Sequence, residues 1–141
     1  MLDGRIMGLD VGDKTIGVSV CDLMGLTAQG VKTVRRVGKK KDIEELKSII
    51  AERQVNKIVS GLPKNMNGTL GPQGEKVIKF CELLEKETGI KIEYWDERLS
   101  TVAAERTLIE GNVRRENRKS VIDMVAAVII LQGYLDRQRN L

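Results

Sequence analysis

The sequence of 141 residues contains no histidine. This absence excludes the Ser-His and Cys-His pairs of many hydrolases, and it excludes zinc sites that are built on imidazole ligands. If the protein hydrolyses a bond, carboxylates that hold metal ions are the expected agents, because that chemistry needs no imidazole.

Cysteine and aromatic residues are also scarce. Cys21 and Cys81 are the only two cysteines, and their wide separation fits no metal-ligand spacing, so each is interpreted as a buried or incidental thiol. Aromatic residues make up 3% of the chain, which argues against a surface that stacks single-stranded bases.

Long apolar runs are missing as well. The longest candidate, 121–131, is too short to cross a membrane and contains Asp123. The first residues carry no cleavage pattern of a signal peptide. We therefore predict a cytoplasmic protein without membrane contact, folded as a single domain over residues 1–141.

Basic residues outnumber acidic ones, 24 against 20, and they are unevenly spread. One cluster lies within 35–41 and a second within 114–119. Such clusters suit a polyanion, because each Lys or Arg near a phosphate releases counterions. A solvated face of an ordinary basic protein explains them equally well. The polar segment 112–119 is also a candidate for closing over a substrate.

The hydrophobic pattern predicts three consecutive strands followed by alternating helices and strands. Strands are expected at 5–10, 15–21, 26–37, 57–60 and 91–95. Helices are expected at 42–53, with Asp42 as its cap, at 75–88, from Ser100 or Thr101 to about 110, and at 120–137, and a glycine-rich loop is expected at 61–74. This order predicts an α/β fold with a mixed five-stranded sheet flanked by helices.

Two strand ends carry carboxylates that are candidates for chemistry. Asp10 ends the first strand just before a glycine turn, where a rigid base and an open approach suit a metal ligand, although a turn-capping role fits it too. Asp96 and Glu97 end the last strand. Consecutive strand residues face opposite ways, so only one of these two can share a site with Asp10, and the pattern does not decide which. A surface charge cluster explains the pair as well.

Asp123 stands inside an apolar helical stretch, where a carboxylate is costly unless it is paired, hydrogen-bonded or bound to metal. Lys119, one turn earlier, is the alternative partner. Two strand ends and a late helix of a mixed α/β fold can bring such carboxylates to one point. The site would hold one or two Mg²⁺ or Mn²⁺ ions, which prefer oxygen ligands and promote phosphodiester cleavage.

The loop at 61–74 offers backbone N–H groups and polar side chains to phosphates, although a plain surface loop is the simpler interpretation. Arg98 is suited to hold either a neighbouring carboxylate or a phosphate. The predicted nucleic-acid contacts are Lys14, Lys64, Asn65, Arg98, Arg114, Arg115, Arg118 and Lys119.

Four sequence blocks together resemble the YqgF family, also called RuvX. They are GLDVGDKTIGVSV at 8–20, GLPKNMNGTLGPQ at 61–73, WDERLSTVAAE at 95–105 and RKSVIDMVAAVIILQGYL at 118–135. They stand in the family's order, and no motif position departs from the pattern. The resemblance implies an RNase H-like fold and a metal-dependent nuclease. By residue, it implies metal carboxylates at Asp10, Glu97 and Asp123, so it favours Glu97 over Asp96.

The resemblance also implies a role in maturing the 5′ end of pre-16S rRNA during ribosome biogenesis, with a ribosomal subunit precursor as a further partner. A Holliday junction resolvase is the alternative within the same class. It should be a symmetric dimer, whereas the sequence leaves both a monomer and a homodimer open.

Two further classes compete with a nuclease. A non-catalytic nucleic-acid-binding module would keep the fold with a dead site, and Asp10→Asn separates it from an enzyme, because in an enzyme the change abolishes cleavage and spares binding. A phosphotransferase of the actin and sugar-kinase type shares the Asp-Val-Gly and Ile-Gly-Val pattern. It is disfavoured, because those proteins close two such domains round a nucleotide and this chain has room for one.

Overall fold

The computed structural model describes residues 2–100, 102 and 118–140, and at 118–120 it describes the backbone alone. The helix predicted from Ser100 or Thr101 to about 110 therefore lies outside the described residues, apart from Ser100 and Val102. Most of the segment predicted to close over a substrate, 112–117, lies outside them as well.

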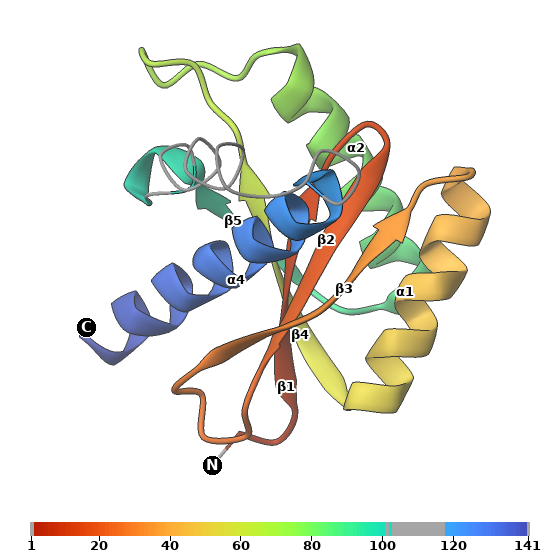
Figure 1. Cartoon of the computed structure of the whole chain (residues 1–141), viewed down its shortest axis with the longest axis vertical. Helices are drawn as coiled ribbons and strands as arrows, with labels where there is room; N and C mark the ends of the chain where they lie inside the picture. The colour runs from red at the N-terminus through yellow and green to blue at the C-terminus, as the bar shows by residue number, and fades with distance from the viewer. Residues whose placement is uncertain (1, 101, 103–117, 141) are drawn as a thin grey trace.

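Five strands form one mixed sheet (Figure 1). Across the sheet, the five strands lie in the order β3-β2-β1-β4-β5, so β1 is the central strand. β1 pairs antiparallel with β2, and β2 with β3, whereas β4 runs parallel to β1 and to β5. The predicted mixed five-stranded sheet is confirmed. Its strands are β1 (Arg5–Val11), β2 (Thr15–Cys21), β3 (Ala28–Arg35), β4 (Val55–Leu62) and β5 (Ile92–Asp96).

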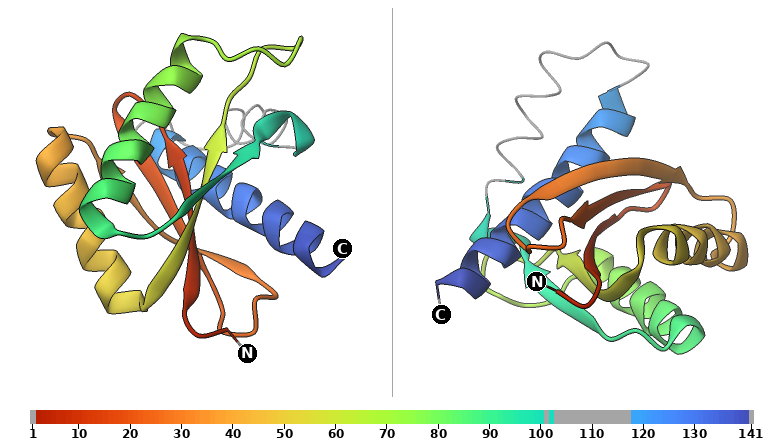
Figure 2. Two further views of the ribbon diagram at one scale, coloured as in Figure 1. Left: turned by 180° about the vertical axis from the view of Figure 1, so that it is seen from behind. Right: turned by 90° about the horizontal axis from the view of Figure 1, so that it is seen from below.

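Helices cover both faces of this sheet (Figure 2). α1 (Lys39–Arg53) and α2 (Pro72–Thr88) lie on one face, and the long helix α4 (Arg118–Arg139) crosses the other. A short 3-10 turn, η1 (Glu97–Leu99), follows β5 directly. In the part of the chain that the structure describes, no helix has both the length and the apolar character needed to cross a membrane.

Side chains alternate between the two faces along the central strands. Met7 and Leu9 of β1 are fully buried in the cluster that α1 and α2 cover. Ile6 packs instead with Ile130 of α4 on the opposite face. Because both faces are covered by helices, β1 has an almost unbroken apolar sequence instead of a strict alternation.

The face beneath α4 carries small residues where the helix crosses it. A Cβ atom added at Gly17 would lie 1.8 Å from the carbonyl oxygen of Asp123, and one at Gly8 would lie 3.0 Å from the carbonyl oxygen of Ala127. These distances leave no room for side chains, so the backbone of α4 lies directly on the strands. The Ser19 hydroxyl secures the contact by donating to the carbonyl of Ala127 at 2.8 Å.

Asp42 does not cap α1, so that prediction is wrong. The helix begins at Lys39, after Gly38, and Asp42 lies within its first turn. Its carboxylate is 1% exposed and accepts hydrogen bonds from the Val37 backbone N–H at 2.9 Å and from Arg36 Nε at 3.2 Å. Asp42 therefore ties the helix back to the segment that follows β3.

The glycine-rich loop predicted at 61–74 is shorter in the structure. β4 continues to Leu62, and α2 already begins at Pro72. Proline suits the first turn of a helix, where the backbone N–H has no helical acceptor. The loop that remains is 63–71, and α4 likewise extends beyond the predicted 120–137.

Both cysteines are buried and neither forms a disulfide. Cys21 belongs to the cluster beneath α4, and Cys81 to the cluster beneath α1 and α2. Burial raises the pKa of the Cys81 thiol to about 11 and also raises the pKa of Cys21. Because reactive thiols have lowered pKa values and are accessible, the interpretation of both as buried thiols is confirmed.

Candidate active site

A cavity of about 390 Å³ lies at the edge of the sheet where β1 and β4 end and β2 begins. Strand ends of an open α/β sheet are places where side chains from separate elements converge. All three carboxylates that the family resemblance selects line this cavity. Its described lining consists of Asp10, Val11, Gly12, Thr15, Pro63, Gln73, Glu97 and Asp123.

Asp10 reaches the cavity from the end of β1. The alternation that directs Met7 and Leu9 toward α1 and α2 turns Asp10 toward the face of α4, where it is 8% exposed. The turn that follows is fixed by Arg36, whose Nη1 donates to the Gly12 carbonyl at 2.7 Å. Asp10 therefore stands on a rigid strand end.

Asp123 reaches the same cavity from α4 and is 7% exposed. The Thr15 hydroxyl donates a hydrogen bond to its Oδ2, which offsets part of the cost of burying a carboxylate. Lys119, the partner that the sequence suggested, has its side chain outside the described residues. Thr15 was missed in the sequence, because no spacing rule links the start of β2 to a helix near the other end of the chain.

Glu97, and not Asp96, lines the cavity. β5 ends at Asp96, and η1 then breaks the alternation of the strand, which is why the strand pattern could not choose between them. Asp96 is bound instead to the Arg98 guanidinium, with Nη2 2.7 Å from Oδ2. This ion pair holds the pKa of Asp96 below its usual range.

The chemistry of the lining fits a hard divalent cation. Three carboxylates, the Thr15 hydroxyl and the Gln73 amide offer oxygen atoms, which Mg²⁺ and Mn²⁺ prefer. Within the described ranges, no group of three or more acidic, cysteine or histidine side chains is placed to hold a metal ion. This is compatible with Mg²⁺, which keeps several water ligands and uses one or two carboxylates together with substrate phosphates.

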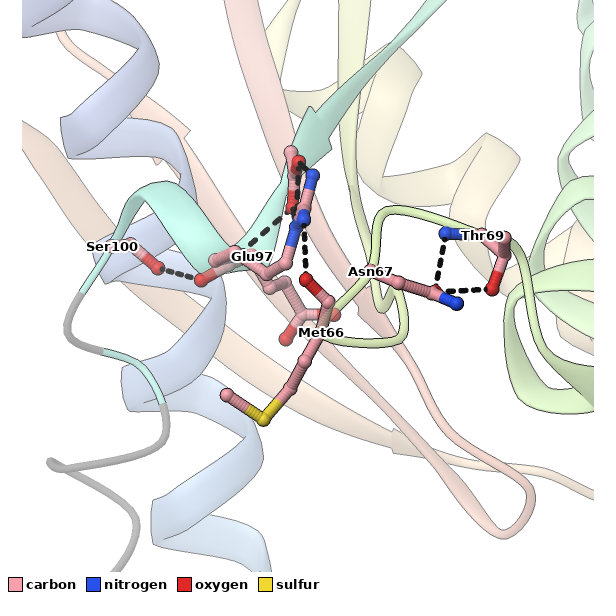
Figure 3. A network of polar contacts seen from close by, with 7 residues as sticks. Met66, Asn67, Thr69, Glu97 and Ser100 are labelled. Carbon is pink, nitrogen blue, oxygen red and sulfur yellow. Dashed lines mark hydrogen bonds and ion pairs between the residues drawn. The ribbon is translucent and has the colours of Figure 1, made fainter.

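Two of the predicted phosphate contacts already have a role in shaping the loop 63–71. The Asn65 backbone N–H donates to the Thr69 carbonyl at 2.9 Å, and its Nδ2 donates to Thr69 Oγ1 at 2.9 Å. Arg98 Nη1 donates to the Met66 carbonyl at 3.2 Å, in addition to its ion pair (Figure 3). Contact of either side chain with a phosphate stays a prediction.

Two predicted contacts are exposed lysines beside the cavity. Lys14 lies in the turn between β1 and β2, and Lys64 follows Pro63, which lines the cavity. Lys64 also lies close enough to Asp96 to help lower the pKa of that carboxyl. Outside the described residues are Arg114 and Arg115, and the side chains of Arg118 and Lys119.

The basic cluster within 35–41 is not wholly a solvated surface or a phosphate site. Arg36 forms an ion pair with Asp42 at 3.2 Å, and its guanidinium lies 4.8 Å from the ring centroid of Phe80. Only the remaining members, Lys39, Lys40 and Lys41 among them, are exposed. Arg36 thus serves the fold and the turn beside the cavity.

Comparison with known sequences gives one family match over nearly the whole chain. The family model described as "RuvX: Holliday junction resolvase" matches residues 4–137. A protein of Clostridioides difficile (strain 630) is 82% identical, over 99% of both chains, and one of Clostridium tetani (strain Massachusetts / E88) is 60% identical, over 96% of this chain and 99% of its own. Both carry the name "Putative pre-16S rRNA nuclease".

Resolvases are among the solved structures that resemble this chain. T. thermophilus RuvC in complex with a Holliday junction substrate has a TM-score of 0.54 at 12% identity, over 96% of both chains. The Fowlpox virus resolvase in complex with Holliday junction DNA has a TM-score of 0.56 at 10% identity, over 95% of this chain and 98% of its own. At these identities the likeness shows the fold alone, and the predicted RNase H-like fold is confirmed.

Proposed function

The chain belongs to the RuvX family, and from that premise we propose that it is a metal-dependent endonuclease that processes the 5′ end of pre-16S rRNA in the cytoplasm. The observation that supports this most directly is the cavity round which Asp10, Glu97 and Asp123 gather from three separate elements. A ribosomal subunit precursor would present the RNA.

In this proposal Asp10, Glu97 and Asp123 would share one or two Mg²⁺ or Mn²⁺ ions, with one or two carboxylates on each ion and with water and substrate phosphate as the other ligands. A bound ion supplies Lewis-acid stabilisation of the charge that develops at a phosphodiester. The protein's own contribution is placement. Asp10 is fixed by the sheet, and Thr15 orients the carboxylate of Asp123 through its hydroxyl hydrogen bond. Rigid supports of this kind keep ligands in productive geometry.

The rim of the cavity supplies the positive charge that a nucleic acid needs. Lys14 and Lys64 are exposed, each is next in the chain to a residue that lines the cavity, and each would neutralise a backbone phosphate. Contacts of this kind give affinity and position without reading sequence, so the selection of a cleavage site must come from the structure of the RNA.

A Holliday junction resolvase is the second candidate, and the description of the matching family favours it. Cutting two strands of a junction together calls for a symmetric dimer with two such cavities. Measuring the mass of the protein in solution, alone and with a four-way junction, separates this candidate from a monomeric RNA nuclease.

The direct experiment incubates the protein with a pre-16S rRNA 5′ fragment and with a four-way DNA junction, in Mg²⁺, Mn²⁺ or EDTA. Asp10→Asn and Glu97→Gln are the inactive variants. Asp13→Asn is the matched control, because this exposed carboxylate pairs with Lys76 at 3.5 Å and does not line the cavity. We expect metal-dependent cleavage of the RNA by the wild type and by Asp13→Asn only.

Other outcomes change the conclusion. Paired cuts in the junction, with intact RNA, would make the protein a resolvase. Binding of either substrate without cleavage, in every metal tested, would favour a non-catalytic nucleic-acid-binding module. Equal cleavage by the wild type and by Asp10→Asn would show that these carboxylates are not the site.

A further inference from the structure

Met66 is the most exposed of the large apolar side chains in the described part of the chain, at 96%. Single exposed apolar residues are common on protein surfaces, so exposure alone indicates nothing. What distinguishes Met66 is the support beneath it and its place beside the candidate active site.

One hydrogen bond holds the backbone of Met66, and further bonds join the residues on either side of it in the loop. Arg98 Nη1 donates to the Met66 carbonyl at 3.2 Å, and Asp96 fixes that guanidinium. Within the loop, the N–H of Gly68 donates to the carbonyl of Asn65 at 2.9 Å, and Gly68 adopts a left-handed φ of 88° that suits glycine. Figure 3 shows the Met66 side chain extending away from these bonds.

This arrangement favours a binding role for Met66, because the loop that carries it is already ordered by hydrogen bonds. Ordering a loop on binding costs conformational entropy, and a loop already ordered avoids most of that cost. The hydrogen bonds of this loop join backbone groups and polar side chains, and they leave the Met66 side chain exposed. The loop therefore presents one apolar side chain from a rigid base.

The loop also stands within reach of the reacting phosphate. It starts at Pro63, which lines the cavity, and Arg98 directly follows Glu97, which lines it as well. Two residues separate Pro63 from Met66, so the Cα atoms of Pro63 and Met66 are at most about 11 Å apart, which corresponds to roughly three base steps along a strand. Met66 can thus meet a base within about three steps of the phosphodiester that the cavity would hold.

We propose that Met66 is a wedge that inserts against an unstacked base within about three nucleotides of the scissile phosphate. The inference rests on the proposed nuclease function and deepens it, because it names the substrate feature that the site selects. Apolar side chains, methionine among them, open base steps in this way, and a thioether packs well on an aromatic ring. Intact stacking resists such insertion. The preferred substrate is therefore a nucleic acid whose stacking is already interrupted, at a branch, a bulge or the end of a helix.

The test uses the full chain with Asp10→Asn, so that substrate is bound and not cut. Substrates are the pre-16S rRNA 5′ fragment and the four-way junction, each prepared as a series in which 2-aminopurine replaces one purine near the interruption. This analogue becomes brighter when it is unstacked. The variants are Met66→Ala, Met66→Gln and Met66→Leu. Met24→Ala is the matched control, because Met24 is 62% exposed and lines a different cavity.

We expect binding to brighten 2-aminopurine at one or two adjacent positions, and Met66→Ala and Met66→Gln to remove that signal. They should weaken binding by roughly two- to tenfold, the range for a methionine against an aromatic ring. Met66→Leu and Met24→Ala should keep both signal and affinity. Uninterrupted duplex of the same length should bind all variants alike.

Binding without brightening at any position would overturn the wedge and leave the nuclease proposal standing. The wedge would also be overturned, with the nuclease proposal intact, if binding of the Met66→Ala variant brightened 2-aminopurine at the same position as binding of the protein with Met66 does. Failure to bind either nucleic acid would overturn the nuclease proposal and the wedge together. Circular dichroism of each variant shows whether a lost signal reflects the missing side chain or a lost fold.

Discussion

The face of the sheet beneath α1 and α2 is filled with large apolar side chains, whereas the face beneath α4 combines a smaller apolar cluster with glycine, serine and carboxylate residues where the helix meets the strands. Leu46 and Leu84 are fully buried on the first face. On the second, Gly17 and Ser19 let the helix backbone rest on the strands. One face thus contributes most to stability through apolar burial, and the other gives up side-chain volume to place Asp123 beside the strand ends.

A buried carboxylate from each face makes the contrast plain. Asp42 is 1% exposed and has a cationic partner, Arg36, together with the backbone N–H of Val37. Asp123 is 7% exposed, and its hydrogen-bond donor is the neutral hydroxyl of Thr15. A carboxylate paired with a cation serves the fold. One held by a hydroxyl at the wall of a cavity keeps its charge available to a ligand.

The largest expected effect comes from neutralising these two carboxylates in turn. Asp123→Asn should abolish cleavage and change the free energy of unfolding by less than about 1 kcal/mol, since functional residues are seldom optimal for stability. Asp42→Asn should cost about 3 kcal/mol, because it leaves Arg36 without its partner, and should keep cleavage. Urea unfolding and cleavage of the same samples check both. If cleavage fell in proportion to the lost free energy of unfolding in both variants, the two carboxylates would not differ in role.

The next largest effect tests the close contact beneath α4. Gly17→Ala puts a Cβ atom against the backbone of Asp123, so the helix must shift. We expect about 100-fold slower cleavage, because a displacement near 1 Å can cost that much, and a loss of about 1–3 kcal/mol in stability. Gly89→Asn is the control, because Gly89 has φ 71° and open space around it. Normal cleavage by Gly17→Ala would show that α4 does not set the geometry of the site.

A smaller effect is expected from the hydroxyl that holds Asp123. Thr15→Val keeps the shape of the side chain and removes the hydrogen bond, so Mn²⁺ affinity should fall about tenfold, at the low end for residues that orient metal ligands. Thr15→Ser should restore most of it. Titration calorimetry with Mn²⁺ measures both. Equal affinity in the valine and serine variants would assign Thr15 to packing alone.

The smallest effect concerns the lysines at the rim. Lys14→Ala and Lys64→Ala should each reduce the slope of log affinity against log salt by about one, since each removes one phosphate contact. Lys91→Ala is the control, because this exposed lysine precedes β5, at the opposite end of the strand from the cavity. Filter binding at several salt concentrations provides the slopes. Slopes that stay unchanged for Lys14 and Lys64 would place the nucleic acid elsewhere.

The sheet could be predicted because its signals are local. The strand from Thr15 to Cys21 is rich in β-branched residues and follows a glycine turn, and its bounds agree with the structure. Pro72 was placed in a loop, although its ring favours the first turn of a helix and α2 begins there. Asp42 was mistaken for a cap, because a capping residue and an ion-paired one look alike until Arg36 is seen beside it.

The site could be predicted in part. Asp123 was found because a carboxylate in an apolar helix is costly and so needs a reason. The choice of Glu97 over Asp96 needed the family resemblance, since a 3-10 turn that ends a strand leaves no mark in the pattern. Thr15 and the supports of Met66 could not be found, because they depend on contacts between segments that only the fold brings together.

The most direct test of the central claim, that the cavity beneath α4 is a metal-dependent active site, is Mn²⁺ binding followed by electron paramagnetic resonance of the free ion. The wild type and Asp42→Asn should bind one or two Mn²⁺ ions with the same affinity. Asp10→Asn, Glu97→Gln and Asp123→Asn should each lose most of that binding while staying folded. Undiminished Mn²⁺ binding by all three cavity variants would contradict the account.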